Sequence, residues 1–313
     1  MPLSLCDRLP DVAAQDLVAG FAPPPHFSHV SFESYRPDPY YPGQAAAVAG
    51  ARAFVAAPAQ VKKRGWLRKA TPAEVRPGIY LDGGFGVGKT HLLASIWHAT
   101  EGRKAFGTFV EYTHLVGALG FAGAVEALSD RVLVCIDEFE LDDPGDTVLM
   151  SSLLMALTER GVRLAATSNT LPDALGEGRF AADDFLREIQ GLSAHFDVLR
   201  IDGVDYRHRG VPKAPPALSE QEVAALVDST PGATLDRFDA VCDHLARVHP
   251  SKYARLVEGV PLVGLTGVHQ LTSQDVALRL VVLVDRLYDN DVPVAAAGES
   301  LGSLFTPEML KGG

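Results

Sequence analysis

The sequence has few cysteines and no long apolar run, and these two shortages exclude several protein classes. Three cysteines occur among the 313 residues, at positions 6, 135 and 242. Their spacing fits no metal-binding motif, and an odd number leaves one thiol over in any disulfide scheme. No stretch reaches the roughly 18–20 uncharged apolar residues that cross a bilayer, and the N-terminus has no apolar h-region of a signal peptide. We therefore expect a cytoplasmic protein with no integral membrane segment.

Positive charge is also scarce. The chain has 28 Lys and Arg against 39 Asp and Glu, which gives a formal net charge of −11. This balance disfavours nucleic acid as a partner, because neutralising phosphates supplies most of that affinity. One basic cluster surrounds Trp66, at positions 62, 63, 64, 68 and 69. It is typical of a solvated surface loop, and the alternative is a contact for an acidic partner or nucleic acid.

Two common catalytic signatures are missing as well. The ten histidines form no H-E-x-x-H pair and no Cys/His cluster, so we expect no structural or catalytic zinc. The sequence contains no G-x-S-x-G or similar nucleophile motif, so we expect no protease activity in the chain itself.

Short apolar segments alternate with helical patterns from Gly78 onward. This alternation predicts an α/β fold with a parallel sheet flanked by helices. The expected strands occupy residues 78–83, 106–112, 131–136, 162–167, 195–201, 260–268 and 292–297. The expected helices occupy residues 44–57, 89–100, 146–160, 218–228, 233–248 and 273–288.

The same pattern divides the chain into three expected parts. Residues 1–75 form an N-terminal extension with a helix and the basic loop, and residues 76–212 form the core. A Pro-rich stretch after Gly210 reads as a linker. Residues 213–313 form a mainly helical C-terminal region with some strands, which could pack on the core sheet.

A glycine-rich segment between the first strand and the next helix fits the phosphate-loop pattern G-x-x-x-x-G-K-[ST]. Its glycines allow backbone N–H groups to point at a phosphate, and the following helix adds the positive end of its dipole. Lys89 would reach the β- and γ-phosphates and Thr90 would bind Mg²⁺. The residues expected to contact the nucleotide are Gly83, Gly84, Phe85, Gly86, Val87, Gly88, Lys89, Thr90 and His91.

An apolar strand that ends in two acids, VLVCIDE, follows at residues 132–138. Asp137 lies at the carboxyl end of this strand, where open α/β sheets bind ligands. We expect Asp137 to hold Mg²⁺, directly or through water, and Glu138 to activate the attacking water. The alternative is an acidic strand end with no catalytic role.

Two further polar residues complete the predicted site. Asn169 ends the next strand and would lie beside the γ-phosphate and the lytic water, as the sensor-1 residue of AAA+ ATPases does; a Ser-Asn pair can also be only a helix cap or turn. Arg179 stands where AAA+ proteins place an arginine that reaches the neighbouring subunit's site. Arg187 is the second choice, and either could be an ordinary surface arginine.

These segments together resemble the ZapE-type cell-division ATPases and their mitochondrial relatives, a branch of the AAA+ class of P-loop NTPases. The matching pieces are YRPDPYYPGQ, GIYLDGGFGVGKTHLL, VLVCIDEFELDDPGD, GVRLAATSNTLPDAL, GRF, GVDYRHR and LVVLVDRLYDNDVPV. They lie between about residue 32 and residue 297, and IDEFELDDPGD and TSNTLPDAL are more specific than the generic motifs. The chain departs from the family in having EYTHLVGAL where a His-Phe-His-rich segment is usual. It also contains no Ser-Arg-Leu segment near its end.

The resemblance implies ATP hydrolysis with Mg²⁺, assembly into a homo-oligomeric ring, and action on a protein target. For bacterial members that target is the tubulin-like division protein FtsZ, and mitochondrial members take part in membrane-protein quality control. Two alternatives share the core motifs. One is a DNA-associated ATPase of the helicase-loader type, and the other is a module that only senses nucleotide, against which Glu138 argues.

Overall fold

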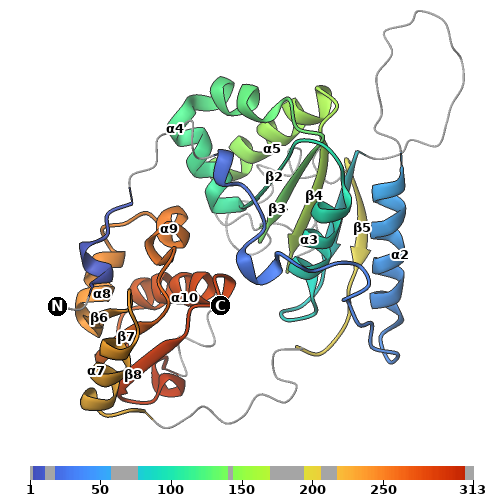
Figure 1. Ribbon diagram of the computed structural model, residues 1–313. Helices are drawn as coiled ribbons and strands as arrows, with labels where there is room; N and C mark the ends of the chain where they lie inside the picture. The colour runs from blue at the N-terminus through green and yellow to red at the C-terminus, as the bar shows by residue number, and fades with distance from the viewer. Residues whose placement is uncertain are drawn as a thin grey trace, which may run out of the picture. The chain divides into compact units, whose positions relative to one another are not determined.

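The computed structural model describes residues 3–10, 18–57, 77–139, 144–169, 194–205 and 217–306 (Figure 1). The chain divides into two units. The larger comprises residues 13–23 and 27–209, and the smaller comprises residues 1–12, 24–26 and 210–313. Each unit has its own parallel sheet.

The sheet of the larger unit has five strands in the order β2-β3-β4-β1-β5. All four pairings are parallel, which confirms the predicted parallel sheet. The strands are β1 (Gly78–Asp82), β2 (Lys104–Thr108), β3 (Leu133–Asp137), β4 (Arg163–Ser168) and β5 (Phe196–Arg200). Because β4 pairs with both β3 and β1, the carboxyl ends of these three strands lie next to one another.

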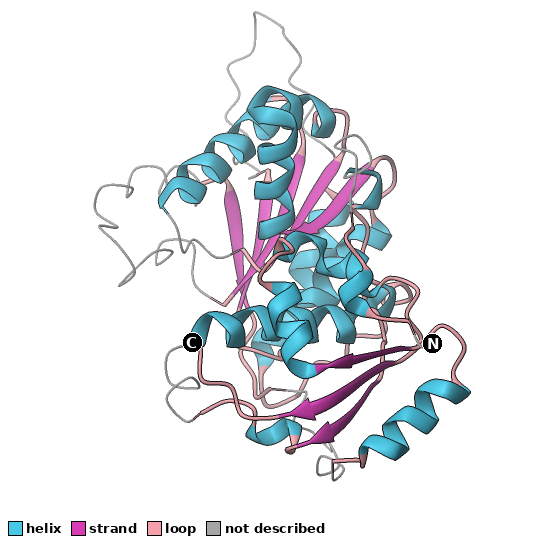
Figure 2. Cartoon of the chain, turned by 90° about the vertical axis from the view of Figure 1, so that its left-hand side faces the viewer, coloured by secondary structure: helices cyan, strands magenta, loops and turns pink. Residues whose placement is uncertain are grey.

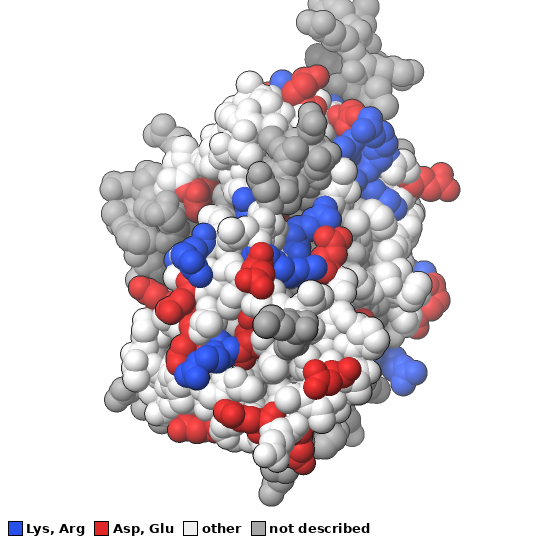
Figure 3. Space-filling model, turned by 60° about the vertical axis from the view of Figure 1, so that its left-hand side comes forward, with Lys and Arg blue, Asp and Glu red and all other residues white. Residues whose placement is uncertain are grey.

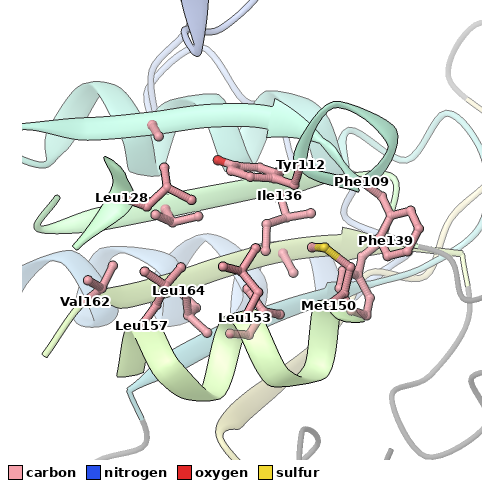
Figure 4. Close-up of a cluster of buried hydrophobic side chains, with 14 of the residues drawn as sticks. Phe109, Tyr112, Leu128, Ile136, Phe139, Met150, Leu153, Leu157, Val162 and Leu164 are labelled. Carbon is pink, nitrogen blue, oxygen red and sulfur yellow. The ribbon is translucent and has the colours of Figure 1, made fainter. Parts of the chain in front are cut away.

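Helices cover both faces of this sheet. Ile79 and Leu81 point to one face and Tyr80 to the other, as the alternation of a strand requires. The first face packs against α2 (Pro42–Ala56) and α3 (Lys89–Ala99), and the second against α4 (Phe109–Leu128) and α5 (Pro144–Glu159). Figure 4 shows the second layer, where Ile136 and Leu164 of the sheet meet Leu153 of α5. Each such buried side chain contributes roughly 1.5–3 kcal/mol to stability.

The strand predicted at 106–112 is wrong in its second half. The observed strand β2 ends at Thr108, and α4 begins at Phe109. The Thr108 side chain accepts a hydrogen bond from the Glu111 N–H, and the Glu111 carboxylate accepts one from the Thr108 N–H. This capping box ends the strand and starts the helix. Within α4, Gly120 has φ 70° and ψ 163°, so two helical segments meet there at a kink.

The smaller unit has a three-stranded parallel sheet in the order β6-β7-β8, which Figure 2 shows with its covering helices. The strands are β6 (Thr234–Arg237), β7 (Val263–Val268) and β8 (Val294–Gly298). On one face lies α7 (Glu220–Ser229). On the other lie α8 (Phe238–Leu245), α9 (Tyr253–Val257) and α10 (Gln274–Asp289).

The helix predicted at 233–248 is wrong in its first residues, which form β6. The N-terminus of the chain contributes to this strand: Leu3 bridges to Thr234, and the Leu5 N–H donates to the Asp236 carboxylate at 2.9 Å. Asp236 is thereby buried in a hydrogen-bonded position. This partner lies more than two hundred residues away in the sequence, so a local helical pattern could not reveal it.

Short 3-10 helices complete the described fold: η1 (Leu5–Asp7), η2 (Val18–Gly20), η3 (Pro25–Phe27), η6 (Pro250–Lys252) and η7 (Leu301–Ser303). None of the helices in the described part of the chain is both long and apolar enough to cross a membrane. On the face drawn in Figure 3, basic and acidic side chains are interspersed. The basic cluster at 62–69 lies outside the described residues.

Candidate nucleotide-binding site

Three adjacent strands bring the predicted site residues to one edge of the larger sheet. The phosphate loop follows β1, Asp137 ends β3, and Asn169 follows β4. Asp82 at the end of β1 is in register with Ser168 at the end of β4. Residues far apart in the sequence therefore share the crevice where parallel α/β sheets bind ligands.

The backbone of the phosphate loop requires its glycines. Gly86 and Gly88 have φ of 64° and 88°, in the left-handed region that side chains disfavour. At Gly83 a Cβ atom would lie 2.3 Å from the Ile201 carbonyl oxygen, and at Gly86 it would lie 1.6 Å from Asp205 Oδ1. The loop is thus closely packed against the segment after β5. Since α3 starts at Lys89, the N–H groups of its first turn have no partner within the helix and suit an anion.

Lys89 lies across this loop. Its ammonium group donates to the carbonyl oxygens of Gly83 at 2.7 Å and Gly84 at 2.6 Å, and to Asn169 Oδ1 at 2.8 Å. The structure therefore joins the phosphate-loop lysine directly to the predicted sensor residue. All three of these acceptors are neutral oxygens, which an anionic phosphate oxygen would outcompete for an ammonium donor.

Thr90 and Asp137 form the second contact between the motifs. The Thr90 hydroxyl lies 3.3 Å from Asp137 Oδ1, and Asp137 is buried. A hydroxyl oxygen beside a carboxylate is the kind of oxygen ligand set that Mg²⁺ prefers. The two residues predicted to bind the metal are thus adjacent and chemically suited to it.

Glu138 stands between two buried residues, Asp137 and Phe139, and is itself exposed. Its φ is 53°, an unusual value for a residue with a side chain. Thr167 of β4 supports this conformation: its hydroxyl accepts the Glu138 N–H at 3.0 Å, and its carbonyl accepts the Phe139 N–H at 2.7 Å. The same hydroxyl donates to Asp137. Thr167 therefore orients both acids, a role that sequence reasoning missed.

We expect Thr167→Val to remove both contacts of the hydroxyl, to the Glu138 N–H and to Asp137, with little change in volume. It would leave the Glu138 N–H without its acceptor, a loss of about 1–3 kcal/mol in the free energy of unfolding. It should also lower kcat for ATP about tenfold, because both acids lose their orienting partner. Chemical denaturation and steady-state turnover measure the two effects. Thr158→Val is the matched control, since that hydroxyl donates to the nearby Met155 carbonyl of α5. Equal kcat values in both variants would contradict the assignment.

A model of the AFG1-like ATPase family matches residues 12–230 and 222–312 of the chain. The chain belongs to this family. Its relatives include the Cell division protein ZapE of Escherichia coli (strain K12), 29% identical over 287 residues, covering 78% of this chain and 76% of that protein. The predicted resemblance and the predicted P-loop fold are thereby confirmed.

A second relative is Lactation elevated protein 1 homolog B of Danio rerio, 24% identical over 280 residues, covering 71% of this chain and 56% of that protein. Among solved structures, that of DnaI is 18% identical with a TM-score of 0.44, covering 58% of this chain and 93% of that chain. Domain III of the Thermotoga maritima replication initiation protein DnaA is 17% identical with a TM-score of 0.42, covering 65% of this chain and 72% of that chain.

This AFG1-like ATPase has a buried acid beside its phosphate loop that sequence reasoning did not single out. Asp82 is buried at the end of β1, and its Oδ2 atom lies 3.5 Å from Arg200 Nη1 of the neighbouring strand. Burial raises the pKa of Asp82, while the positive charges of Arg200 and Lys89 act in the opposite direction. Arg200 also donates to Asp202 at 2.9 Å, so it links two acids at the rim of the loop.

The structure describes two more of the predicted site residues, Phe85 and His91, and does not describe the two candidate arginines. Phe85 is 65% exposed at the tip of the phosphate loop. His91 is partly buried on α3 and contacts the Ser34 hydroxyl at 2.9 Å and the Ser31 carbonyl at 3.1 Å. Burial lowers the pKa of His91. Arg179 and Arg187 lie outside the described residues.

Proposed function

We propose that the chain hydrolyses ATP with Mg²⁺ and uses this reaction to remodel or regulate a protein partner in cell division. One observation carries the proposal that the chain hydrolyses ATP. The Lys89 ammonium contacts Asn169, and the Thr90 hydroxyl contacts Asp137, so three separate motifs converge at one edge of the sheet. Membership of the AFG1-like ATPase family supports the use of ATP, and the name of the Escherichia coli relative supports a role in cell division.

Each residue has a distinct part in the proposed reaction. The N–H groups of the loop and Lys89 hold the phosphates, and Lys89 exchanges the Gly83, Gly84 and Asn169 oxygens for phosphate oxygens. Thr90 and Asp137 would hold Mg²⁺, which would neutralise charge on the phosphates when bound. Glu138 accepts a proton from the attacking water, and Asn169 orients that water once Lys89 contacts the phosphates.

We expect Lys89→Ala to weaken ATP binding about a hundredfold, because charge-assisted hydrogen bonds to phosphate contribute about 1.5–3 kcal/mol. Titration calorimetry with ATP and Mg²⁺ measures the affinity directly. Lys252→Ala is the matched control, since Lys252 lies in η6 of the smaller unit. Equal affinities for ATP in wild type and Lys89→Ala would contradict the proposed site.

The proposed partner can be tested with the Glu138→Gln variant held in ATP. This variant should retain a partner that is released after hydrolysis, and the tubulin-like division protein FtsZ is the first candidate. Co-sedimentation of purified FtsZ filaments with Glu138→Gln, with and without ATP, measures the interaction. Lys89→Ala, with its expected loss of ATP affinity, is the control at an ATP concentration that saturates Glu138→Gln. ATP-independent or absent co-sedimentation would contradict FtsZ as the nucleotide-controlled partner.

A further inference from the structure

A segment outside the phosphate-loop and acidic-strand motifs packs directly on the phosphate loop. We call residues 31–44, which precede and enter α2, the N-terminal strap. Its central contact is Tyr35, whose hydroxyl donates to the Val87 carbonyl oxygen at 2.8 Å. The Tyr35 ring lies against Gly88, where an added Cβ would come within 2.6 Å of Tyr35 Cε2. Tyr35 is 9% exposed, and burial raises the pKa of its hydroxyl to about 12, so the hydroxyl remains a donor.

The hydrogen bond to Val87 fixes the orientation of the next N–H group. The Val87–Gly88 peptide is planar and trans, so the Val87 carbonyl and the Gly88 N–H point in opposite directions. Tyr35 lies in the hydrophobic cluster between the sheet, α2 and α3. Holding the carbonyl toward this cluster turns the Gly88 N–H away from the protein interior. Since the backbone N–H groups of a phosphate loop point at the bound phosphate, this orientation would suit the Gly88 N–H to that role.

The orientation of this N–H group needs support because it belongs to a glycine, Gly88. Gly88 has a φ of 88° and no side chain. Its backbone therefore has more conformational freedom than any other residue type would have at this position. A peptide beside a glycine can rotate at low cost, and the N–H would then lose its aim at an anion. A buried hydrogen bond from outside the loop restricts that rotation before any ligand binds.

The strap is itself anchored at both ends. Near Tyr35, the His91 ring contacts the Ser34 hydroxyl and the Ser31 carbonyl, and lies edge-on to the Tyr35 ring with centroids 5.6 Å apart. At the other end, Gln44 accepts the Asp38 N–H at 2.8 Å and donates to the Asp202 carbonyl at 2.9 Å. The second bond ties the strap to the segment after β5 that packs against Gly83.

We propose that the N-terminal strap is part of the nucleotide site, and that Tyr35 is a positioning residue that holds the Gly88 N–H toward the bound phosphates. This inference rests on the proposed nucleotide site, and it extends the site beyond the phosphate loop and the two acids. Tyr35 is expected to act on binding rather than on chemistry, because its hydroxyl donates to the loop backbone at Val87 and its ring lies against Gly88.

Tyr35→Phe tests this proposal because it removes the hydroxyl and keeps the ring against Gly88 and His91. We expect the Kd for ATP with Mg²⁺ and the KM to rise about three- to tenfold, with kcat within about twofold of wild type. Tyr253→Phe is the matched control. Tyr253 is fully buried in the smaller unit, and its hydroxyl likewise donates to a backbone carbonyl, that of Leu245, at 2.8 Å.

Binding is measured by calorimetry, turnover by phosphate release, and folding by thermal unfolding without nucleotide. The proposal is supported if Tyr35→Phe raises Kd while Tyr253→Phe, with a comparable thermal shift, leaves Kd unchanged. It is overturned if both variants bind ATP as wild type does, or if kcat falls at constant KM. A wild-type protein that binds ATP without hydrolysing it would end the proposed function, whereas the Kd comparison would still decide the role of Tyr35.

Discussion

Replacing Glu138 with glutamine is expected to lower the rate of ATP hydrolysis about a thousandfold while ATP remains bound. A positioned general base contributes roughly 10²–10⁴-fold to a rate, and glutamine cannot accept the proton of the attacking water. The amide keeps the size of the carboxylate and leaves the Glu138 N–H bonded to Thr167. The loss should therefore lie in kcat, with little change in the affinity for ATP.

Single-turnover measurements with saturating enzyme separate this chemical step from binding. Glu159→Gln is the matched control, because Glu159 is exposed at the end of α5. It should hydrolyse ATP at the wild-type rate. Normal turnover by Glu138→Gln would show that another group activates the water. A lower affinity of this variant for ATP would show that Glu138 contributes to ATP binding rather than to the hydrolysis step.

The backbone of Glu138 gives a physical reason for this choice of base. A non-glycine residue at φ 53° is strained by about 1–2 kcal/mol, and such strain persists where surrounding contacts hold it. Here the Thr167 hydroxyl and carbonyl hold the chain on both sides of the residue. The strained turn exposes the Glu138 carboxylate and buries its neighbours. Backbone strain of this kind is typical of residues whose side chain must keep one direction for function, as a catalytic base must.

The sequence predicted the parts of the site whose chemistry is local. The phosphate loop needs glycines followed by Lys and Thr, and the next motif needs an apolar strand that ends in acids, so each could be recognised within a few residues. The order β2-β3-β4-β1-β5 is set by long-range pairing. It places Asn169 between the other two motifs, and the 2.8 Å contact to Lys89 follows from that order.

Other features could not be predicted because their partners are distant or their signal is generic. Tyr35 begins YRPDPYYPGQ, a segment that matches the family but suggests no role for its residues, and the contact of Tyr35 to Val87 crosses more than fifty residues. In the sequence Thr167 has no feature that sets it apart from other strand residues. Its role depends on the pairing of β4 with β3, which brings it next to Asp137 and Glu138. By contrast, Thr108 and Glu111 have the spacing of a capping box, which could have shown that β2 ends before residue 112.

Replacing Arg179 with alanine is expected to lower kcat for ATP about 10³-fold with no loss of ATP binding. An arginine that stabilises the charge of the transferring phosphoryl group contributes 10³–10⁵-fold in other P-loop enzymes. The assignment rests on the position of Arg179 in the sequence GEGRF, ten residues after Asn169. Arg187→Ala distinguishes the second choice, and Arg160→Ala at the end of α5 is a surface control. A large loss with Arg187→Ala alone would transfer the role to that residue.

Mixing two inactive variants tests whether Arg179 acts on a neighbouring subunit. The Arg179→Ala protein keeps the nucleotide-binding residues, and the Lys89→Ala protein keeps the arginine but has lost most of its affinity for ATP. If the arginine acts in trans within a ring, some sites in a mixed assembly combine an intact loop with a neighbour's intact Arg179. ATP hydrolysis should then return on mixing and rise with the fraction of mixed assemblies. Mixed assemblies that form, as shown by differently tagged subunits, and remain inactive would place Arg179 in its own subunit's site or outside the reaction.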